Sequence, residues 1–165
     1  MIELWKTSTL KQFEAALCMF NDCMRKCPDA HWDTPVAKYP FWHVAYHTLC
    51  FVDLYLTRDN DSFVFRDLHP AREKELLDEY PSRRFVRSEI ESYVQICRDK
   101  AAESINSETE QTLAGSSGFE WCRFSRAEMH LYNLRHLMHH TGQLGACLRR
   151  IDPSIDPIWA GSGWK

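Results

Sequence analysis

Three histidines, whose side chains can bind metal ions, lie within one short stretch of the chain, at positions 136, 139 and 140. In a helix, residues four apart lie about 40° apart around the axis. His136 and His140 therefore point the same way and can share one metal ion, since imidazole is a common metal ligand near neutral pH. His139 is rotated toward Tyr132, so we expect it to be peripheral.

A third ligand must come from another segment, and two further histidines also lie four residues apart. His43 and His47 occur in the apolar run FWHVAYHTLCFVDLYL. Metal sites in helical bundles are built from side chains on facing helices, and three protein ligands leave a position for water or substrate. A single histidine on an apolar face is often an ordinary core residue, and for His43 alone we favour that interpretation.

Apolar residues at three-and-four spacing predict the helices that would carry these histidines. We expect helices over residues 7–25, 40–56, 82–104 and 125–151. Ser8 or Thr9 would cap the first helix, and Pro28 would end it. Pro40 suits the first turn of the second helix. Ser125 and Glu128 have capping-box spacing at the start of the fourth.

The remaining segments are less regular, and no strand pattern is convincing. We expect a short helix within residues 71–80, a polar loop over 107–118, and an extended segment or turn over 119–124. Long connections inside compact domains often lie over functional openings. The chain therefore predicts an all-α fold: a single 1–165 domain forming an up-down four-helix bundle, with a long connection between helices 2 and 3.

His136 and His140 share a helix face that should point into this bundle. The other members of the stripe are Met129, Asn133, Leu144 and Cys147. Buried histidines need polar partners, because an unpaired polar group away from water is costly. A metal ion would satisfy both rings, although spacing alone also permits an accidental pair.

Composition excludes several classes of function. The formal net charge is −3 without a long basic run, which argues against nucleic acid as a partner. Arg83, Arg84 and Arg87 form a small cluster that we interpret as a solvated helix start. No apolar stretch reaches the roughly 18 residues needed to cross a bilayer, and the N-terminus lacks a signal pattern. We therefore expect a cytoplasmic protein.

The chain contains seven cysteines. An odd number without a signal peptide indicates reduced thiols. Cys18, Cys23 and Cys27 resemble a metal cluster, but they lack the paired spacing of common zinc sites. Because free cysteine is a common core residue, we favour a structural role for them.

The sequence resembles the DinB/YfiT-like superfamily of metal-dependent enzymes. The resemblance lies in the histidine of WHVAYHTLCFVDLYL and in the H-x-x-x-H-x-G-Q motif of HLMHHTGQL, and the order of helices extends it over most of the chain. It implies a four-helix bundle with the ligands His47, His136 and His140, which bind zinc or nickel. It also implies a homodimer formed through helix faces. Whether His43 replaces or joins His47 as a ligand from this segment stays open. Asp53 follows His47 by six residues in the same segment.

The same motif contains Gly142 and Gln143. Glycine costs about 1 kcal/mol relative to alanine inside a helix, so we expect a packing reason for Gly142, such as the close approach of another helix. Gln143 is expected either to hydrogen-bond near the site or to be a plain polar side chain.

Two reactions fit an open metal position. A metal can acidify bound water for hydrolysis, or it can deprotonate a bound thiol. Hydrolysis benefits from a carboxylate base, for which Asp53 and Glu128 are candidates. Relatives that use low-molecular-weight thiols favour a metal-dependent enzyme acting on a small molecule, of the thiol S-transferase type. The alternatives are a metal-dependent hydrolase and a noncatalytic metal-binding stress or interaction protein. The aromatic residues expected near the pocket are Trp42, Tyr46, Trp121 and Tyr132.

Overall fold

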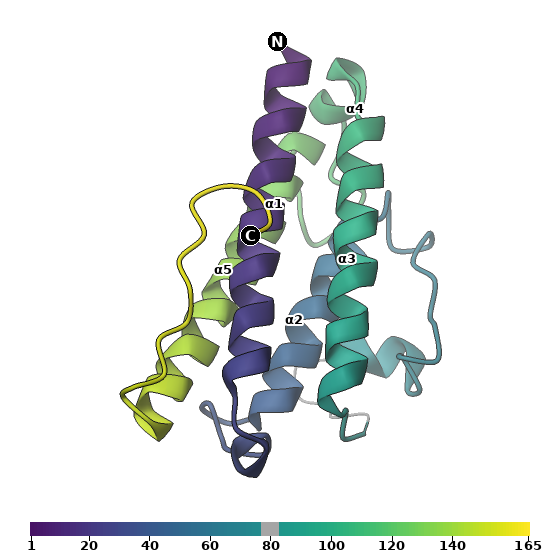
Figure 1. The fold of residues 1–165 in the computed structure, drawn as a ribbon. Coiled ribbons are helices and arrows are strands. Elements are labelled where there is room, and N and C mark those ends of the chain that lie inside the picture. Colours follow the sequence, from purple (N-terminus) through teal and green to yellow (C-terminus); the bar gives the residue numbers. More distant parts are fainter. Residues whose placement is uncertain (77–82) are drawn as a thin grey trace.

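The computed structural model describes residues 1–76 and 83–165. Within these residues the fold is all-helical, as predicted, and the β-type pairing consists of two isolated bridges. Figure 1 shows the arrangement. The elements are α1 (Ile2–Lys26), η1 (Asp29–His31), α2 (Phe41–Tyr55), η2 (Arg72–Leu76), α3 (Arg87–Ser107), α4 (Glu110–Ala114) and α5 (Arg126–Ile151).

The long helices α1, α2, α3 and α5 pack side by side. Helix α1 contacts α3 and α5, and α2 contacts the same two helices. Helices α2 and α3 run in the same direction (Figure 1), as Tyr46 beside Tyr93 and Leu49 beside Cys97 also show. Strict up-down alternation is therefore wrong for this pair. The long connection over 56–86 was predicted, and it returns the chain to the end of the molecule at which α2 begins.

Helix α1 is longer than the sequence pattern indicated. It begins at Ile2, and Met1 precedes it without a side-chain cap, so the predicted cap at Ser8 or Thr9 is wrong. The first turns are held from outside the helix, because Trp5 packs edge-on against His130 of α5 at 5.4 Å between ring centroids. The end was predicted correctly: Cys27 adopts an extended conformation directly before Pro28.

The starts of the next two helices also differ from the predictions. Pro40 is the N-cap of α2 and lies outside its first turn. Helix α3 begins at Arg87 instead of residue 82, which lies outside the described residues. The Val86 N–H donates to Glu89 Oε2 at 2.9 Å and defines this start.

The irregular segments contain more helix than expected in one place. The predicted 107–118 loop includes α4, whose first turn is capped by Thr109. Of the helix predicted over 71–80, the described part is the short 3-10 turn η2, and residues 77–80 lie outside the description. Residues 119–124 form turns.

A buried arginine joins the end of α2 to the beginning of α5. The Arg126 side chain is 1% exposed and donates to the carbonyl oxygens of Tyr55, Leu56 and Thr57. It also pairs with the buried carboxylate of Glu108 at 3.0 Å. Because the last carbonyls of a helix need donors, Arg126 completes α2 and fixes the register of α5 against it.

The cysteines and the small arginine cluster agree with the structural interpretations. All seven cysteines are free and buried, and burial raises the pKa of Cys23 and Cys27 to about 12. Arg83, Arg84 and Arg87 form ion pairs with Glu89, Asp33 and Asp29 at the surface.

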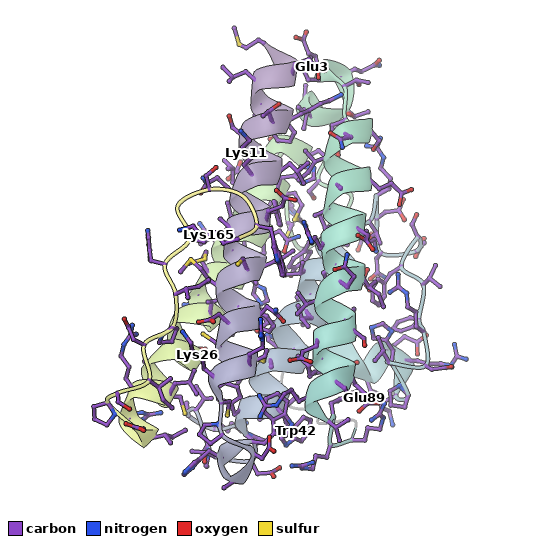
Figure 2. The ribbon with its side chains drawn as sticks, viewed as in Figure 1. Glu3, Lys11, Lys26, Trp42, Glu89 and Lys165 are labelled. Atoms are coloured by element: carbon purple, nitrogen blue, oxygen red, sulfur yellow. The ribbon has the colours of Figure 1, made fainter. Side chains whose placement is uncertain are left out.

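The C-terminal segment after α5 returns along α1. Gly163 N–H donates to the Lys11 carbonyl oxygen at 2.9 Å, and Figure 2 shows Lys165 beside this helix. Among the described helices, none combines the length and apolar character needed to cross a membrane.

Candidate metal centre

Three imidazoles converge between α2 and α5. His47 comes from α2, His136 and His140 come from α5, and one ligand nitrogen from each lies within 4.8 Å of the others. The Nε2 atoms of His47 and His136 are 3.4 Å apart. Two nitrogens bound tetrahedrally to one zinc ion at about 2.0–2.1 Å would lie about 3.3 Å apart. The three residues therefore form a group that could hold a metal ion.

The neighbouring residues on α5 point inward as the stripe predicted. Asn133, one turn before His136, is fully buried and donates to the Val52 carbonyl oxygen of α2 at 3.1 Å. Together with the Arg126 contacts, this hydrogen bond holds the two ligand-bearing helices in register. The other stripe residues, Met129, Leu144 and Cys147, are also buried.

Two histidines of the triad, His47 and His136, have the protonation state that metal binding requires. Burial, together with the charge of His140, lowers the pKa of His47 to about 3. The same two causes lower the pKa of His136 to about 2. Both rings are neutral at pH 7, and neutral imidazole is the form that coordinates metals. Within the described part of the chain, the buried His136 Nδ1 atom has no hydrogen-bond partner.

Gln143 fixes the tautomer of the third ligand. The His140 Nδ1 atom lies 2.8 Å from Gln143 Oε1. An amide oxygen only accepts hydrogen bonds, so Nδ1 carries the proton and Nε2 keeps its lone pair. Partners of this kind orient metal-binding histidines and increase their basicity. Of the two alternatives left open for Gln143, the structure shows the hydrogen bond near the site, with Gln143 as the acceptor.

Gly142 does not mark a close helix contact. It is exposed, and a Cβ atom added there would meet no described atom within 4 Å. Gly145, the other glycine of α5, is buried, and an added Cβ there would make ordinary contacts at 3.7 Å with Pro157 and 3.9 Å with Cys23 Sγ. The packing reason expected for Gly142 is therefore wrong.

The other two histidines near the centre have different positions. His47, and not His43, is the α2 histidine in the metal-competent group. The buried His43 ring packs edge-on against Tyr39, with 4.7 Å between ring centroids. His139 is exposed, and its ring lies 5.0 Å from that of His140. Its predicted peripheral place is confirmed.

The triad forms part of the wall of a pocket of about 460 Å³. Tyr132 lines this pocket as expected, together with Tyr39 and Tyr55, which sequence reasoning missed. Trp42, Tyr46 and Trp121 are not among its lining residues. Tyr46, for example, stacks on Phe85 at 4.1 Å and donates to the Leu68 carbonyl oxygen, on another face of α2. Tyr55 follows His47 by eight residues, so helical spacing could have identified it.

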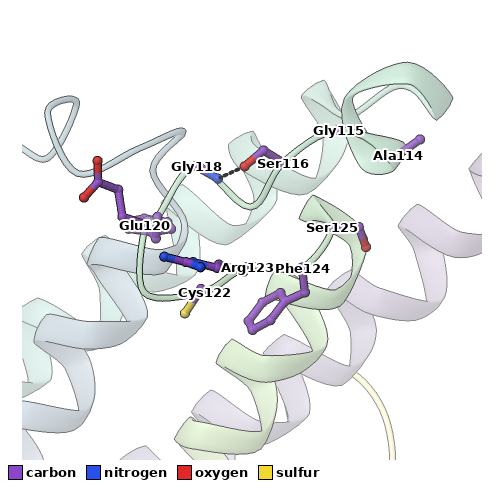
Figure 3. A pocket seen from close by; sticks show the side chains of 10 residues that line it. Ala114, Gly115, Ser116, Gly118, Glu120, Cys122, Arg123, Phe124 and Ser125 are labelled. Carbon is purple, nitrogen blue, oxygen red and sulfur yellow. Dashed lines mark hydrogen bonds between the residues drawn. The ribbon is translucent and has the colours of Figure 1, made fainter.

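A larger hollow of about 840 Å³ lies elsewhere, over the loop before α5 (Figure 3). It is lined by residues from Ala114 to Ser125 and contains none of the triad histidines. Cavity size alone therefore would have indicated a different part of the molecule, whereas the convergence of ligand atoms identifies the smaller pocket.

The two carboxylates considered as bases lie away from the pocket. Asp53 is fully buried and bonds to Arg66, Tyr93 and Lys100. Glu128 is exposed in the first turn of α5, where its N–H donates to Ser125 Oγ at 3.2 Å. Neither of these two candidates lines the pocket.

Comparisons with protein-family models, curated proteins and solved structures found no match to this chain. The candidate centre is therefore defined by its own geometry: three imidazoles from two helices, fixed in register, at the wall of a small-molecule-sized pocket.

Proposed function

We propose that this protein binds one divalent metal ion, zinc or nickel, through His47, His136 and His140, and acts as a metal-dependent enzyme on a small molecule. The reaction type that we favour is thiol S-transfer. The observation that carries the proposal is the convergence of three ligand nitrogens within 4.8 Å at a pocket wall. Three imidazoles are a suitable donor set for zinc, copper, iron or nickel.

In this proposal, three residues would bind the metal ion and a fourth would orient one of the ligands. The triad holds the ion, and Gln143 keeps the His140 Nε2 lone pair directed toward it. A divalent ion bound here would supply an open coordination position at which a thiol is deprotonated. The pocket, at about 460 Å³, falls within the range of about 300–1,000 Å³ that is typical of small-molecule sites.

The pocket lining supports thiol transfer over hydrolysis. Among the described residues that line it, none carries a carboxylate. A metal-dependent hydrolase usually benefits from a carboxylate that accepts the proton of the attacking water. A thiol needs no such base when the metal lowers its pKa. Membership of the DinB/YfiT-like superfamily remains part of this proposal, supported by the motif residues that meet at the centre.

Location and assembly belong to the same proposal. All seven cysteines are free, which supports a reducing compartment such as the cytoplasm, where low-molecular-weight thiols are abundant. Dimerisation through helix faces would be checked by sedimentation equilibrium, in which a monomer mass of 19.4 kDa would contradict it.

The first experiment measures metal content. The purified protein should retain about one divalent ion per chain after dialysis, and the double variant His136→Ala/His140→Ala should retain none. His139→Ala is the matched control, because His139 is adjacent in sequence but outside the metal-competent group. Loss of metal in the control alone, or no metal in any form, would refute the proposal.

The second experiment distinguishes the reaction classes. The metal-loaded protein is mixed with several small thiols and a chlorodinitrobenzene electrophile. Transfer forms a sulfur–carbon bond, releases chloride and leaves the thiol proton in solution. Turnover that depends on both metal and thiol supports the proposal. Ester hydrolysis without thiol would instead indicate a hydrolase, and bound metal with neither activity would indicate a noncatalytic protein.

A further inference from the structure

A tight turn directly before α2 forms part of the wall of the triad pocket. The four residues between Pro35 and Pro40 all line this pocket. The turn closes on itself, because the Val36 N–H donates to the Tyr39 carbonyl oxygen at 2.9 Å and the two prolines pair as an isolated bridge. Each proline also has a fixed φ. Lys38, within this turn, is therefore held at the pocket by a segment of defined shape.

Both helices that carry the candidate ligands hold this turn in place. The Arg150 side chain of α5 donates to the Val36 carbonyl oxygen at 3.0 Å. On α2, the buried His43 ring packs edge-on against Tyr39 at 4.7 Å between centroids. The Lys38 ammonium lies 5.3 Å from the centre of the same Tyr39 ring. The position of the turn relative to the triad is therefore set by contacts that the chain makes by itself.

The charge of the pocket differs from that of the chain as a whole. The chain has 23 acidic and 20 basic residues. Among the described residues that line the pocket, however, none is acidic, and Lys38 is the one lysine or arginine. A concave site lined by charge of one sign attracts ligands of the opposite sign. The lining therefore favours an anion.

A metal ion at the triad would strengthen this preference. Imidazole coordinates metals in its neutral form, so three histidine ligands leave both positive charges of a divalent ion uncompensated. No described residue of the pocket lining supplies a carboxylate to balance them. A cationic ligand would be repelled by the ion and by Lys38 together, whereas an anionic ligand would be attracted by both.

The start of α2 does not compete for this anion. The first N–H groups of a helix can bind anions when they have no other acceptor. Here the N–H groups of Phe41 and Trp42 donate to carbonyl oxygens of the preceding segment, at 2.9 and 3.2 Å, and the next two donate to the Pro40 carbonyl oxygen. Lys38 therefore provides the cationic group of this wall.

We propose that the pocket takes a small organic anion and that Lys38 is the residue that selects it. One end of the ligand binds the metal ion at the triad, and a carboxylate at the other end pairs with the Lys38 ammonium. This inference rests on the proposed metal-binding function and specifies the charge of the ligand of that same site. It does not depend on which reaction follows.

The test uses the full chain loaded with Co²⁺, whose visible absorption changes when a hydroxamate coordinates the ion. The probes are the monohydroxamates of succinate, glutarate and adipate, each paired with the neutral alkyl hydroxamate of the same length. The wild type should bind at least one carboxylate probe more tightly than its neutral partner. Lys38→Met should reduce that preference about threefold, the size expected of an exposed ion pair, and leave binding of the neutral probe unchanged.

Two further variants separate recognition of charge from a structural role of the turn. Lys38→Glu reverses the charge of the wall and should shift the preference toward the matching aminoalkyl hydroxamate by about tenfold relative to the wild type. Lys11→Met is the matched control. It makes the same change in net charge as Lys38→Met, but Lys11 belongs to α1 and is not among the residues that line the pocket.

Each outcome has a separate meaning. A wild type without preference for any carboxylate probe, a preference unchanged in both Lys38 variants, or an equal loss in Lys11→Met would refute the inference and leave the metal proposal intact. A loss in Lys38→Met without the shift in Lys38→Glu would also refute it, because a change in the shape of the turn would then explain the loss. A wild-type chain that binds no Co²⁺ would refute both proposals.

Discussion

Two polar clusters flank helix α2, and they differ in how their polar atoms are satisfied. On one side Asp53 is fully buried, yet its oxygens accept from Arg66, Tyr93 and Lys100. On the other side, the His47–His136–His140 triad brings three imidazole rings together, with no carboxylate among the described pocket residues. The Asp53 carboxylate is matched by cations of the chain, whereas the triad presents ligand nitrogens that could hold a metal ion.

This difference indicates a structural role for the Asp53 cluster and a ligand-binding role for the triad. Around Asp53 the contacts continue within the chain: His69 Nδ1 accepts from the Arg66 N–H, and His69 Nε2 donates to Tyr93 at 2.8 Å. Such a network stabilises the fold. The triad instead brings one ligand nitrogen from each of three imidazoles within 4.8 Å of the others. A cluster whose ligand atoms converge at a pocket wall is the better candidate for a ligand site.

The largest expected effect comes from breaking the Asp53 cluster. Asp53→Ala leaves the Arg66 and Lys100 cations without their shared carboxylate, and losing one member of a buried ion pair costs about 3–5 kcal/mol. Urea unfolding in the presence of a chelator should show this loss of stability. A change below about 1 kcal/mol would mean that the Asp53 cluster is not structural, and the comparison would fail.

A smaller stabilisation is expected from a metal ion at the triad. Adding Zn²⁺ at about 100 times its dissociation constant should raise the free energy of unfolding by about 2.7 kcal/mol. The shift should disappear in His136→Ala/His140→Ala and persist in His139→Ala, as read from thermal melting. Equal Zn²⁺ stabilisation of all three proteins would place the metal elsewhere.

Acid should distinguish the two clusters in the metal-free protein. The folded-state pKa values of His47 and His136, about 3 and about 2, lie below the ordinary histidine value of 6.5. Their neutral state therefore contributes stability that is present above pH 6.5 and is lost as the pH falls toward 3. We expect about 2 kcal/mol per histidine to be lost between pH 7 and pH 5.

Part of that loss should remain when the triad is removed. Burial also lowers the pKa of His69, to about 4, so His136→Ala/His140→Ala should reduce the acid sensitivity without abolishing it. Below pH 4.5 a further loss is expected from Glu108, because hydrogen bonds from His130, Thr112 and Arg126 overcome its burial and hold its pKa at about 2. An unchanged slope between pH 7 and 5 in the double variant would contradict the assignment to the triad.

The smallest effect concerns the residue that orients His140. Gln143→Leu removes the acceptor for His140 Nδ1 and should lower metal affinity about tenfold, the lower end for partners of metal-binding histidines. Competition with a coloured chelator measures this change. Gln143→Glu keeps an acceptor and is the control. If Gln143→Leu binds metal as tightly as the wild type, the tautomer of His140 is set in another way.

Local patterns predicted the helices and the triad because both depend on spacing within one segment. Apolar periodicity located α2 and α5, and the four-residue interval put His136 and His140 on one face. The parallel course of α2 and α3 could not be predicted, because it depends on the path of the long connection between them. The partners of Asp53 were also hidden, since Tyr93 and Lys100 lie 40 and 47 residues away in sequence.

The pocket was predicted least well. Tyr39 comes from the segment before α2, which local spacing does not place, whereas Tyr55 lies on α2 two turns after His47 and could have been identified. Trp42, Tyr46 and Trp121 were predicted near the pocket and do not line it. The packing role predicted for Gly142 was also wrong. Pro157, which lies beyond the end of α5, is near Gly145 instead.

Arg126 is attached to the end of α2. The number of residues between Arg126 and the histidines of α5 therefore determines where these histidines point relative to His47. Inserting one residue between Arg126 and His136 would rotate both α5 ligands by about 100° relative to His47, while every side chain of the triad remained present. Length variation in this protein should therefore be tolerated in the connection after α2 and excluded from the nine positions, 127–135, between the arginine and the first ligand of α5.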